Sequence, residues 1–308
     1  MSTWATCAAR PAIWLVSGQY LANPVRQAGP RPAARQVWGN RMKSMKLYSD
    51  VHRIYNNLAA LGIGPEDPLS TDQLLPFDQY HYEGTHAVDL AMQSLGLAPN
   101  ESLLDIGSGI GGPARYVAQR FGLRVTALEL QPDLDAVARD LTRRCGLAAL
   151  LQHESGDILD GTARGPYDGI ISLLCMLHIP DKPRLFAACR AALRPGRAMY
   201  IEDFAAARPL SPSEAESLAV KVQATALPPP DEYRDHLRTA GFAEVTLTDV
   251  TEDWRRFSAG RLAAWRDQKA EHHRIHGAAI VEGLEDFYRS VDDLWQGGAL
   301  VGLRVLAR

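Results

Sequence analysis

Cysteine is scarce in this chain of 308 residues, and its spacing argues against two classes of structural site. The four cysteines are Cys7, Cys145, Cys175 and Cys189, and no two of them form a Cys-X-X-Cys pair. Disulfide frameworks of secreted domains and zinc sites depend on closely grouped cysteines. We therefore expect no disulfide framework, no zinc site and a reducing compartment.

Long apolar runs are lacking as well. No uninterrupted apolar stretch approaches the roughly 18 residues that a transmembrane helix requires. His272 and His276 have the i, i+4 spacing of metal ligands on a helix, but the sequence offers no third ligand for them. We therefore predict neither a membrane span nor a metal site.

Acidic residues are missing from residues 1–49, which carry seven basic ones. The rest of the chain has 26 basic and 36 acidic residues, so a general electrostatic surface for nucleic acid is not expected. Residues 1–45 are rich in Ala, Arg, Ser and Pro, which is typical of a transit peptide for a mitochondrion or plastid. The alternative is a cytoplasmic protein with a tail that has no targeting function.

A glycine-rich turn follows the apolar run that begins at Leu103. The run ends in Asp105, and the turn contains Gly107, Gly109 and Gly111 before a segment with helical spacing. Glycine permits positive φ and close approach of a ligand, and the first turn of a helix presents unpaired N–H groups. The stretch is thus predicted to be a nucleotide-binding turn between a strand and a helix.

Acidic residues also end the next two predicted strands. Glu129 ends a buried strand at 124–129, where its carboxylate can accept hydrogen bonds from ribose hydroxyls. Asp157 and Ile158 follow a strand at 150–154 and suit the amino group and the face of an adenine. No later segment looks like a second mononucleotide-binding half, which argues against a dinucleotide.

The alternation of strands and helices predicts the fold class. Five strands separated by helices require a parallel sheet with right-handed crossovers, and the site then lies at the carboxyl ends of the strands. The expected strands are 103–106, 124–129, 150–154, 168–174 and 198–203, and the expected helices between them are 113–121, 133–144 and about 182–193.

Segments on both sides of this core are expected to cover it. Residues 46–100 are predicted to form a cap, with a helix near 47–61, a loop rich in Pro and Asp, and a helix at 85–95. Residues 101–308 form the main domain, with insertions at about 207–230 and 252–291. The first insertion is expected to hold one helix at 213–226 and the second a long helical segment at 254–291. A helix at 231–240 and strands at 243–249 and 299–307 complete this region.

The segment Asp105-Ile-Gly107-Ser-Gly109-Ile-Gly111, together with Glu129 and Asp157-Ile158, resembles the class I S-adenosylmethionine-dependent methyltransferases. The resemblance implies a seven-stranded Rossmann-like sheet with an antiparallel last strand, and S-adenosylmethionine as the cofactor. The cofactor-binding residues it implies are Tyr82, Asp105, Gly107, Ser108, Gly109, Gly111, Glu129, Leu130, Asp157, Ile158 and Leu173.

A narrower resemblance covers roughly residues 47–308. The segments 78–84, 177–182 and 231–233 and the Gly297-Gly298 pair are similar to the sarcosine/dimethylglycine and phosphoethanolamine N-methyltransferases. In the phosphoethanolamine enzymes a tyrosine of the first helix and a histidine after the fourth strand shield the site and assist proton removal. The matching residues are Tyr48 and His178, which are therefore the predicted catalytic residues.

The predicted chemistry is consistent with such a pair. Methyl transfer is an in-line displacement, so the enzyme mainly aligns the reactants and excludes water. An amine is protonated at neutral pH and must first lose a proton, which a histidine can accept. The predicted reaction is methylation of the nitrogen of a small amine or zwitterion.

The sequence departs from the phosphoethanolamine enzymes just before His178. Those enzymes carry an acid four residues before the histidine and an arginine before that, whereas this chain has Leu173-Leu174-Cys175-Met176. The predicted pocket floor is apolar, which leaves a thioether S-methyltransferase open as the alternative. Methylation of a quinone or tocopherol ring and a cofactor-binding protein without turnover are further alternatives.

Aromatic residues near strand ends or in the cap are candidates for binding a methylated cation. Each aromatic face that contacts such a cation stabilises it by about 0.5–2 kcal/mol. Arg255 is the predicted partner of a substrate carboxylate, with Arg256, Arg261 and Lys221 as further candidates. The partner is a small-molecule acceptor, and whether the protein is a monomer or a homodimer stays open. The predicted substrate-binding residues are Tyr55, Tyr80, Phe204, Tyr233, Trp254 and Arg255.

Overall fold

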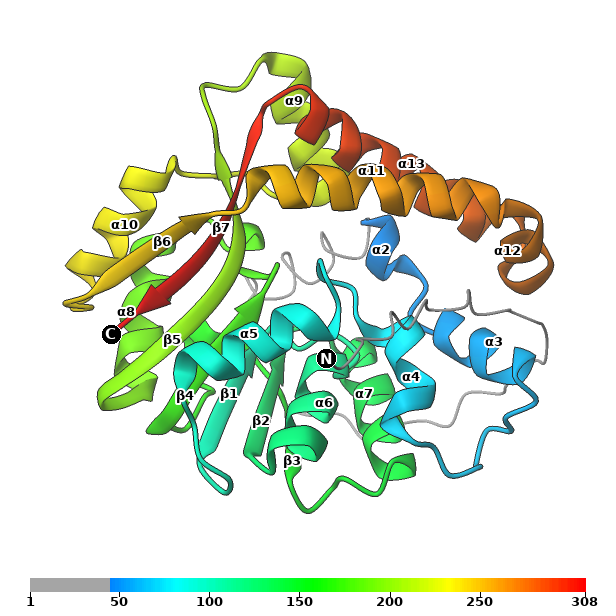
Figure 1. The fold of residues 1–308 in the computed structure, drawn as a ribbon, viewed down its shortest axis with the longest axis horizontal. Coiled ribbons are helices and arrows are strands. Elements are labelled where there is room, and N and C mark those ends of the chain that lie inside the picture. The colour runs from blue at the N-terminus through cyan, green and yellow to red at the C-terminus, as the bar shows by residue number, and fades with distance from the viewer. Residues whose placement is uncertain (1–44) are drawn as a thin grey trace, which may run out of the picture.

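The computed structural model describes residues 45–308. It consists of a seven-stranded sheet with helices on its faces and a helical lid over one edge (Figure 1). The predicted transit peptide lies outside these residues, except for Met45. The order of the strands across the sheet is β3-β2-β1-β4-β5-β7-β6. The strands are β1 (Ser102–Ile106), β2 (Arg124–Glu129), β3 (Leu151–Ser155), β4 (Tyr167–Leu173), β5 (Leu193–Ala206), β6 (Val245–Asp249) and β7 (Leu300–Ala307).

The first five strands run parallel, and β7 is antiparallel to both of its neighbours. The predicted class I methyltransferase architecture is therefore confirmed. Strand β5 is longer than the predicted strand at 198–203. Leu193 already pairs with Tyr167, and Pro195-Gly196, which was expected to separate the preceding helix from the strand, lies inside β5. The flanking helices are α5 (Thr85–Leu95), α6 (Gly112–Phe121), α7 (Pro132–Arg144), α8 (Lys182–Ala192) and α10 (Pro230–Thr239).

The amino-terminal part of the lid contains α2 (Lys46–Ser49), α3 (Arg53–Ala60) and α4 (Thr71–Asp78). Helix α4 occupies the segment predicted to be a loop, so that prediction is wrong. It begins with a reciprocal capping box, in which the Ser70 and Gln73 side chains each bond to the other's backbone N–H. Pro76 lies inside the helix, and the cap and the packing of Leu74 and Phe77 evidently offset its cost.

The segment after β5 also differs from its prediction. Helix α9 (Pro212–Ser217) passes into the π-helical turn η3 (Leu218–Val222), and this turn ends at Gln223 with φ +59°. The single helix predicted at 213–226 is therefore too long. Gln223 then directs the chain back toward the carboxyl ends of the strands, where its carbonyl lies beside His178.

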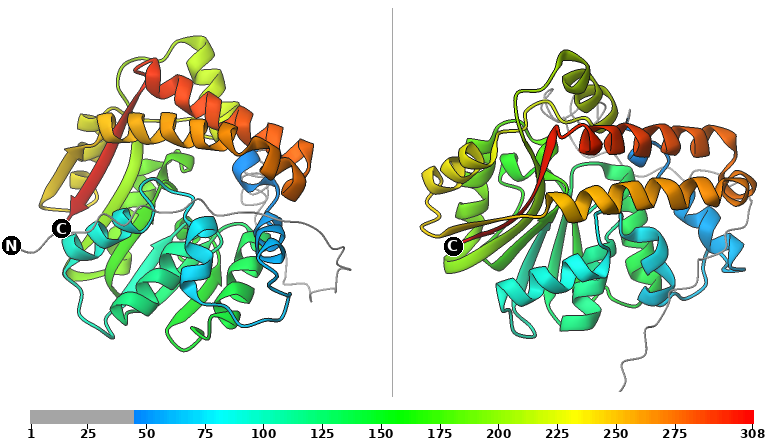
Figure 2. Two further views of the ribbon diagram at one scale, coloured as in Figure 1. Left: turned by 45° about the vertical axis from the view of Figure 1, so that its right-hand side comes forward. Right: turned by 45° about the horizontal axis from the view of Figure 1, so that its top comes forward.

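The long segment between β6 and β7 is helical, as predicted, and forms three helices: α11 (Thr251–Asp267), α12 (Lys269–His276) and α13 (Ala278–Gln296). Figure 2 shows α11 and α13 lying side by side above the sheet, with α12 at the far end of the hairpin. Gly277, with φ +77°, makes the turn between α12 and α13. No helix in residues 45–308 has the length and apolar character needed to cross a membrane.

Candidate active site

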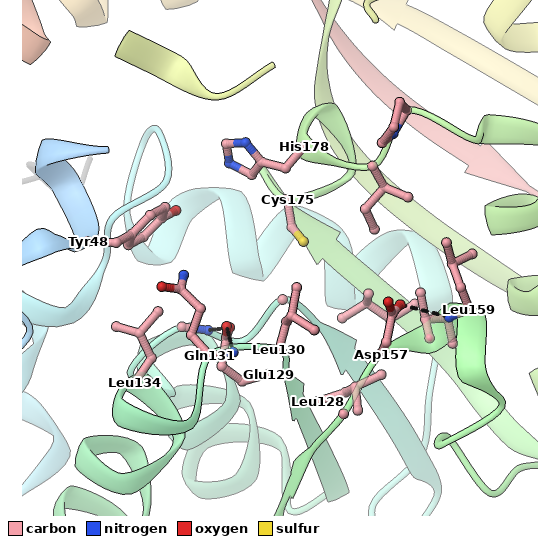
Figure 3. Close-up of a pocket in the computed structure, with 17 residues that line it drawn as sticks. Tyr48, Leu128, Glu129, Leu130, Gln131, Leu134, Asp157, Leu159, Cys175 and His178 are labelled. Carbon is pink, nitrogen blue, oxygen red and sulfur yellow. Dashed lines mark hydrogen bonds between the residues drawn. The ribbon is translucent and has the colours of Figure 1, made fainter. Parts of the chain in front are cut away.

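A cavity with about 840 Å³ of space free of protein atoms lies at the carboxyl ends of β1 to β4. Figure 3 shows Tyr48, Cys175 and His178 on one side of it and Glu129 and Asp157 on the other. The predicted residues that line this cavity are Gly107, Gly109, Glu129, Leu130, Asp157 and Ile158. The sheet therefore brings together residues that are spread over three strand ends in the sequence.

The glycine turn gives this cavity a wall of exposed backbone. Gly107 has φ +74°, and a Cβ there would lie 2.1 Å from Cys175 Sγ. Gly109 has φ +58°, and a Cβ there would meet no atom within 4 Å, so open space lies beside its backbone. Glycine is thus required at 107 by both conformation and space and at 109 by conformation.

Glu129 connects the glycine turn to the end of β2. Its Oε2 accepts a hydrogen bond from the Gly109 N–H at 2.9 Å, and its Oε1 accepts one from the Gln131 N–H at 2.8 Å. Each carboxylate oxygen has two lone pairs, so both can accept a further bond from a ligand hydroxyl. This arrangement fits the predicted contact with a ribose.

Asp157 and Ile158 form the wall at the end of β3. The Asp157 Oδ1 accepts a hydrogen bond from the Leu159 N–H at 2.9 Å and caps the short helical turn η1 (Ile158–Asp160). This cap fixes the carboxyl group at the cavity, with the apolar Ile158 next to it. An acceptor beside a flat apolar surface fits the predicted adenine contact.

Asp105 lies behind the turn and is almost fully buried. Its Oδ2 has no hydrogen-bond partner among residues 45–308. Burial, and then the negative charge of Glu129, raise the pKa of Asp105 to about 7. An unsatisfied buried carboxyl oxygen is costly and is typical of a site completed by a ligand. Since the cavity also has acidic but no Lys or Arg residues in its described lining, it fits a cationic adenosyl cofactor.

A second cavity, with about 680 Å³ of free space, lies under the lid and shares Tyr48, His178 and the glycine turn with the first. Its acidic residue, Asp78, forms a fully buried ion pair with Arg115 at 3.0 Å. We call this the acceptor cavity, because it adjoins the cofactor cavity on the side of His178. Its wall is mainly apolar and includes Leu47, Leu173, Leu174, Leu177, Phe204 and Val222.

His178 and Tyr48 lie at the junction of the two cavities. Their ring centroids are 6.3 Å apart, with the rings nearly perpendicular. Burial lowers the pKa of His178 to about 4 and raises that of the Tyr48 hydroxyl, so both are neutral at pH 7. The His178 Nδ1 lies 3.4 Å from the Gln223 carbonyl oxygen. The tautomer that donates this bond leaves Nε2 as a proton acceptor.

Buried charges fix the turn that carries His178. The Lys182 ammonium donates hydrogen bonds to the carbonyls of Met176 and Ile179, at 2.8 and 2.7 Å. The Leu177 N–H donates to Asp203 Oδ1 at 2.9 Å. The histidine is therefore held from both sides by bonds to its neighbours' backbone.

The floor before His178 is divided between the two cavities. Leu173 and Leu174 line the acceptor cavity, and Cys175 lines the cofactor cavity. Met176 is fully buried in the core and contributes to neither. Leu174 has φ +54°, a left-handed conformation that is strained for leucine and is found mainly at functional sites.

The other predicted cofactor residues lie close by but not all in the cofactor cavity. Ser108 and Leu173 line the acceptor cavity, and Gly111 is the N-cap of α6. Tyr82 also lies on the acceptor side, where its ring packs on Trp254 at 5.1 Å. Of the predicted substrate residues, Tyr80 and Phe204 line the acceptor cavity.

Four predicted substrate residues lie outside the lining of both cavities. The Tyr55 hydroxyl donates to Asp140, and the Tyr233 hydroxyl donates to Asp203 in the core. Trp254 is fully buried among other aromatic rings. Arg255 pairs with Glu252 on an outer face of α11. Tyr55, Tyr233 and Arg255 thus bond to other residues of the protein, and Trp254 packs in the aromatic core. The structure therefore places all four away from the predicted position at the acceptor.

Several residues of the two cavities were not predicted from the sequence. Gln131 and Ile179 line the cofactor cavity, and Leu177, Val222 and Phe287 line the acceptor cavity. The apolar character of the four residues other than Gln131 does not distinguish a cavity wall from ordinary core. Gln131, two residues after the strand-end acid Glu129, carried a signal, because side chains just after a strand end face the site.

Comparisons with known proteins agree with this architecture. The family described as "Methyltransferase domain" matches residues 80–275. Phosphoethanolamine N-methyltransferase 1 of Zea mays is 32% identical over 164 residues, which cover 53% of this chain and 32% of that protein. The sarcosine/dimethylglycine N-methyltransferase of Halorhodospira halochloris is 27% identical over 208 residues, which cover 66% of this chain and 72% of the relative.

A solved structure shares the fold. The phosphoethanolamine N-methyltransferase 2 of Haemonchus contortus, in complex with phosphomonomethylethanolamine and S-adenosylhomocysteine, has a TM-score of 0.75 at 20% identity. The match covers 90% of this chain and 61% of that one. The chain spans about a third of the length of the plant phosphoethanolamine relatives that it matches. Methyltransferases of this kind use S-adenosylmethionine, which the cavity fits, and the chain belongs to the methyltransferase domain family.

Proposed function

We propose that the chain transfers a methyl group from S-adenosylmethionine to the nitrogen of a small amine or zwitterion, of the sarcosine/dimethylglycine or phosphoethanolamine type. The observation that carries this proposal is the junction of the two cavities at Tyr48 and His178. An acceptor under the lid would lie next to a neutral proton acceptor and beside the cofactor cavity. The names of the relatives support a nitrogen acceptor.

The residues of the chain contribute position, dryness and a proton acceptor. Bound S-adenosylmethionine would supply an electrophilic methyl group on a sulfonium. Glu129 and Asp157 orient the nucleoside end, and the leucines of the acceptor cavity exclude water. The rings of Tyr48 and Tyr80, with centroids 6.4 Å apart, offer aromatic faces to a cationic amine.

The His178 Nε2 accepts the proton that the ammonium group must lose. Because burial lowers the pKa of His178 to about 4, the imidazole is neutral at pH 7 with Nε2 unprotonated, and it does not hold a second proton for long. It therefore acts as a relay that passes the proton on to water. The Tyr48 hydroxyl stays protonated and serves as a hydrogen-bond donor or as part of the wall.

Release of adenosylhomocysteine tests this function. The wild-type chain is assayed with phosphoethanolamine, glycine, sarcosine and dimethylglycine, and in parallel with methionine, methylthio-hydroxybutyrate and a quinol precursor. Turnover on an amine, with loss of turnover in His178→Gln, supports the proposal. Turnover on none of the amines, with the cofactor bound, would contradict it.

A thioether S-methyltransferase is the second candidate, and the apolar floor favours it. Leu173, Leu174 and Leu177 line the acceptor cavity. Leu174 stands four residues before His178, where the resemblance to the phosphoethanolamine enzymes implies an acid. A thioether needs no proton removal, so His178→Gln would leave its turnover nearly unchanged. That insensitivity separates the two reactions in the same assay.

For the location of the protein we propose an organelle, on the composition of residues 1–45. A fluorescent protein fused after residue 45 would be imported into mitochondria or plastids. A diffuse cytoplasmic signal would contradict the proposal.

A further inference from the structure

A third cavity lies on the far side of the acceptor cavity, between α3 and α4 on one side and the α11–α13 hairpin on the other. It has about 1070 Å³ of free space and shares Leu47, Tyr80 and Arg261 with the acceptor cavity. We call it the outer cavity. The cofactor, acceptor and outer cavities thus form a series in which each shares residues with the next.

The outer cavity is basic. Arg53 and Arg261 line it, and its described lining contains no Asp or Glu. Neither arginine forms an ion pair with a carboxylate in residues 45–308, and residues 1–44 contain no acidic residue that could supply one. The other three arginines of α11 do have carboxylate partners: Arg255 pairs with Glu252, Arg256 with Asp253, and Arg266 with Glu285.

Arg53 and Arg261 both contact Tyr80, one at its ring and the other at its backbone carbonyl. The Arg53 guanidinium is 4.7 Å from the Tyr80 ring centroid, and its Nη1 donates to the Leu47 carbonyl at 2.6 Å. The Arg261 Nη1 donates to the Tyr80 carbonyl at 3.4 Å, and its guanidinium lies 4.6 Å from the Tyr82 ring centroid. A guanidinium has five N–H donors, so both retain donors for a ligand.

Burial makes this arrangement informative. Arg53 is only 7% exposed, and a buried charge without a counterion is costly unless a ligand supplies one. Two more side chains add to the lining: Asn57, which is 5% exposed, and Trp265, whose indole N–H is buried and has no partner among residues 45–308. The guanidinium group of arginine binds phosphate or carboxylate groups through forked hydrogen bonds, and two such groups line this cavity.

We propose that Arg53 and Arg261 bind the distal phosphate or carboxylate group of the methyl acceptor, while an apolar spacer of the acceptor crosses the acceptor cavity to the nitrogen beside His178. This inference rests on the proposed transfer of a methyl group to nitrogen, and it extends the substrate class from short amines to longer ones. The acceptor is an ω-amino acid or ω-amino phosphate with an apolar middle section. Its anionic group lies beyond the leucine wall rather than next to the reacting nitrogen.

A series of ω-aminoalkyl phosphates, from aminoethyl to aminooctyl phosphate, tests the spacer. Binding to the wild-type chain is measured by calorimetry with adenosylhomocysteine present, and turnover is measured separately. We expect the dissociation constant to fall by about tenfold or more along the series, because each added methylene is buried on the apolar wall. Octylamine, with the same chain and no phosphate, should bind much more weakly than aminooctyl phosphate.

The arginines are tested with Arg261→Gln and Arg53→Gln. Each should weaken aminooctyl phosphate binding by about 10- to 100-fold and change octylamine binding much less. Arg256→Gln is the matched control, because Arg256 is an exposed, ion-paired arginine of the same helix. If Arg53→Gln does not fold, Arg53→Lys keeps the charge and should retain part of the phosphate preference.

Equal binding of octylamine and aminooctyl phosphate would overturn the proposal. So would inorganic phosphate that binds as tightly as aminooctyl phosphate with the same dependence on the arginines, since the site would then hold a free anion. If no amine is methylated but the chain-length and arginine effects persist in calorimetry, the proposed reaction fails and the anion subsite stands. If amines are methylated but the arginine substitutions have no effect on binding, the anion subsite fails and the proposed reaction stands.

Discussion

The cofactor cavity and the outer cavity carry charges of opposite sign. Glu129 and Asp157 line the first, which has no Lys or Arg in its described lining, whereas Arg53 and Arg261 line the outer one. The acceptor cavity lies between them, with its acid Asp78 neutralised by Arg115. The difference suggests that the sheet selects a cationic cofactor and the lid an anionic end of the acceptor.

The largest effect is expected from a substitution of Glu129 in the acidic cofactor cavity. Glu129→Ala removes the acceptor for the Gly109 and Gln131 N–H groups as well as for the ribose. We expect the cofactor dissociation constant to rise about 100-fold, since a hydrogen bond to a charged group contributes about 1.5–3 kcal/mol. Calorimetry with adenosylhomocysteine measures it, and unchanged affinity would remove Glu129 from the site.

A substitution of His178 tests the junction of the cofactor and acceptor cavities. His178→Gln should lower kcat by about 10- to 50-fold, less than the usual 10²–10⁴ of general bases, because burial lowers the pKa of His178 to about 4. Cofactor affinity should change little. The kcat of the wild type should show no titration near pH 6.5. Equal losses of turnover and cofactor affinity would mark His178 as structural.

Asp105 offers a test in which stability and function move in opposite directions. Its folded pKa is about 7, raised from 3.8, so the stability linked to its proton is complete below pH 4 and is lost as the pH rises through 7. Asp105→Asn should therefore raise the free energy of unfolding at pH 8 by about 1–3 kcal/mol, as followed by urea denaturation. Cofactor binding should weaken, and no gain at pH 8 relative to pH 4 would contradict the burial argument.

The apolar floor can be given the charge it lacks. Leu174→Asp places a carboxylate in the acceptor cavity, at a left-handed position that Asp tolerates. If short amines are acceptors, the KM for phosphoethanolamine should fall by about three- to fivefold, the range of an exposed ion pair. Leu174→Asn is the matched control without charge. An equal effect of both would exclude attraction of the ammonium group.

The smallest effect is expected from removing residues 1–44. A chain that begins at Met45 retains Met45 and Leu47, which line the acceptor cavity. Its cofactor affinity and turnover should equal those of the full chain. A loss of folding would contradict the interpretation of these residues as a targeting segment.

The half of the site that binds the cofactor could be predicted from the sequence because it depends on strand ends. A parallel sheet brings the residues after its strands to one edge, so Glu129 and Asp157 had to lie near the glycine turn. Tyr82 was placed less accurately. It follows no strand, and its position depends on how the lid packs.

The lid was predicted less well, for reasons that particular residues illustrate. Trp254 and Tyr233 were expected at the acceptor, but both pack in the core. Large aromatic side chains stabilise the fold most when they are buried. Helix α4 was missed because its segment was interpreted as a loop rich in Pro and Asp, although Ser70 and Gln73 carried the signal of a capping box. Arg261 could not be ranked above Arg255, since only the structure distinguishes a paired arginine from one without a carboxylate.

The position of β7 affects the order in which the protein can be assembled on the ribosome. Strand β7 lies between β5 and β6, and β6 is at the edge of the sheet with no other neighbour. The α11–α13 hairpin is connected to β6 at one end and to β7 at the other. Neither strand can join the sheet until residues 300–307 have been synthesised. The parallel strands can pair earlier, so the nascent chain gains a cofactor cavity before it can close the acceptor cavity.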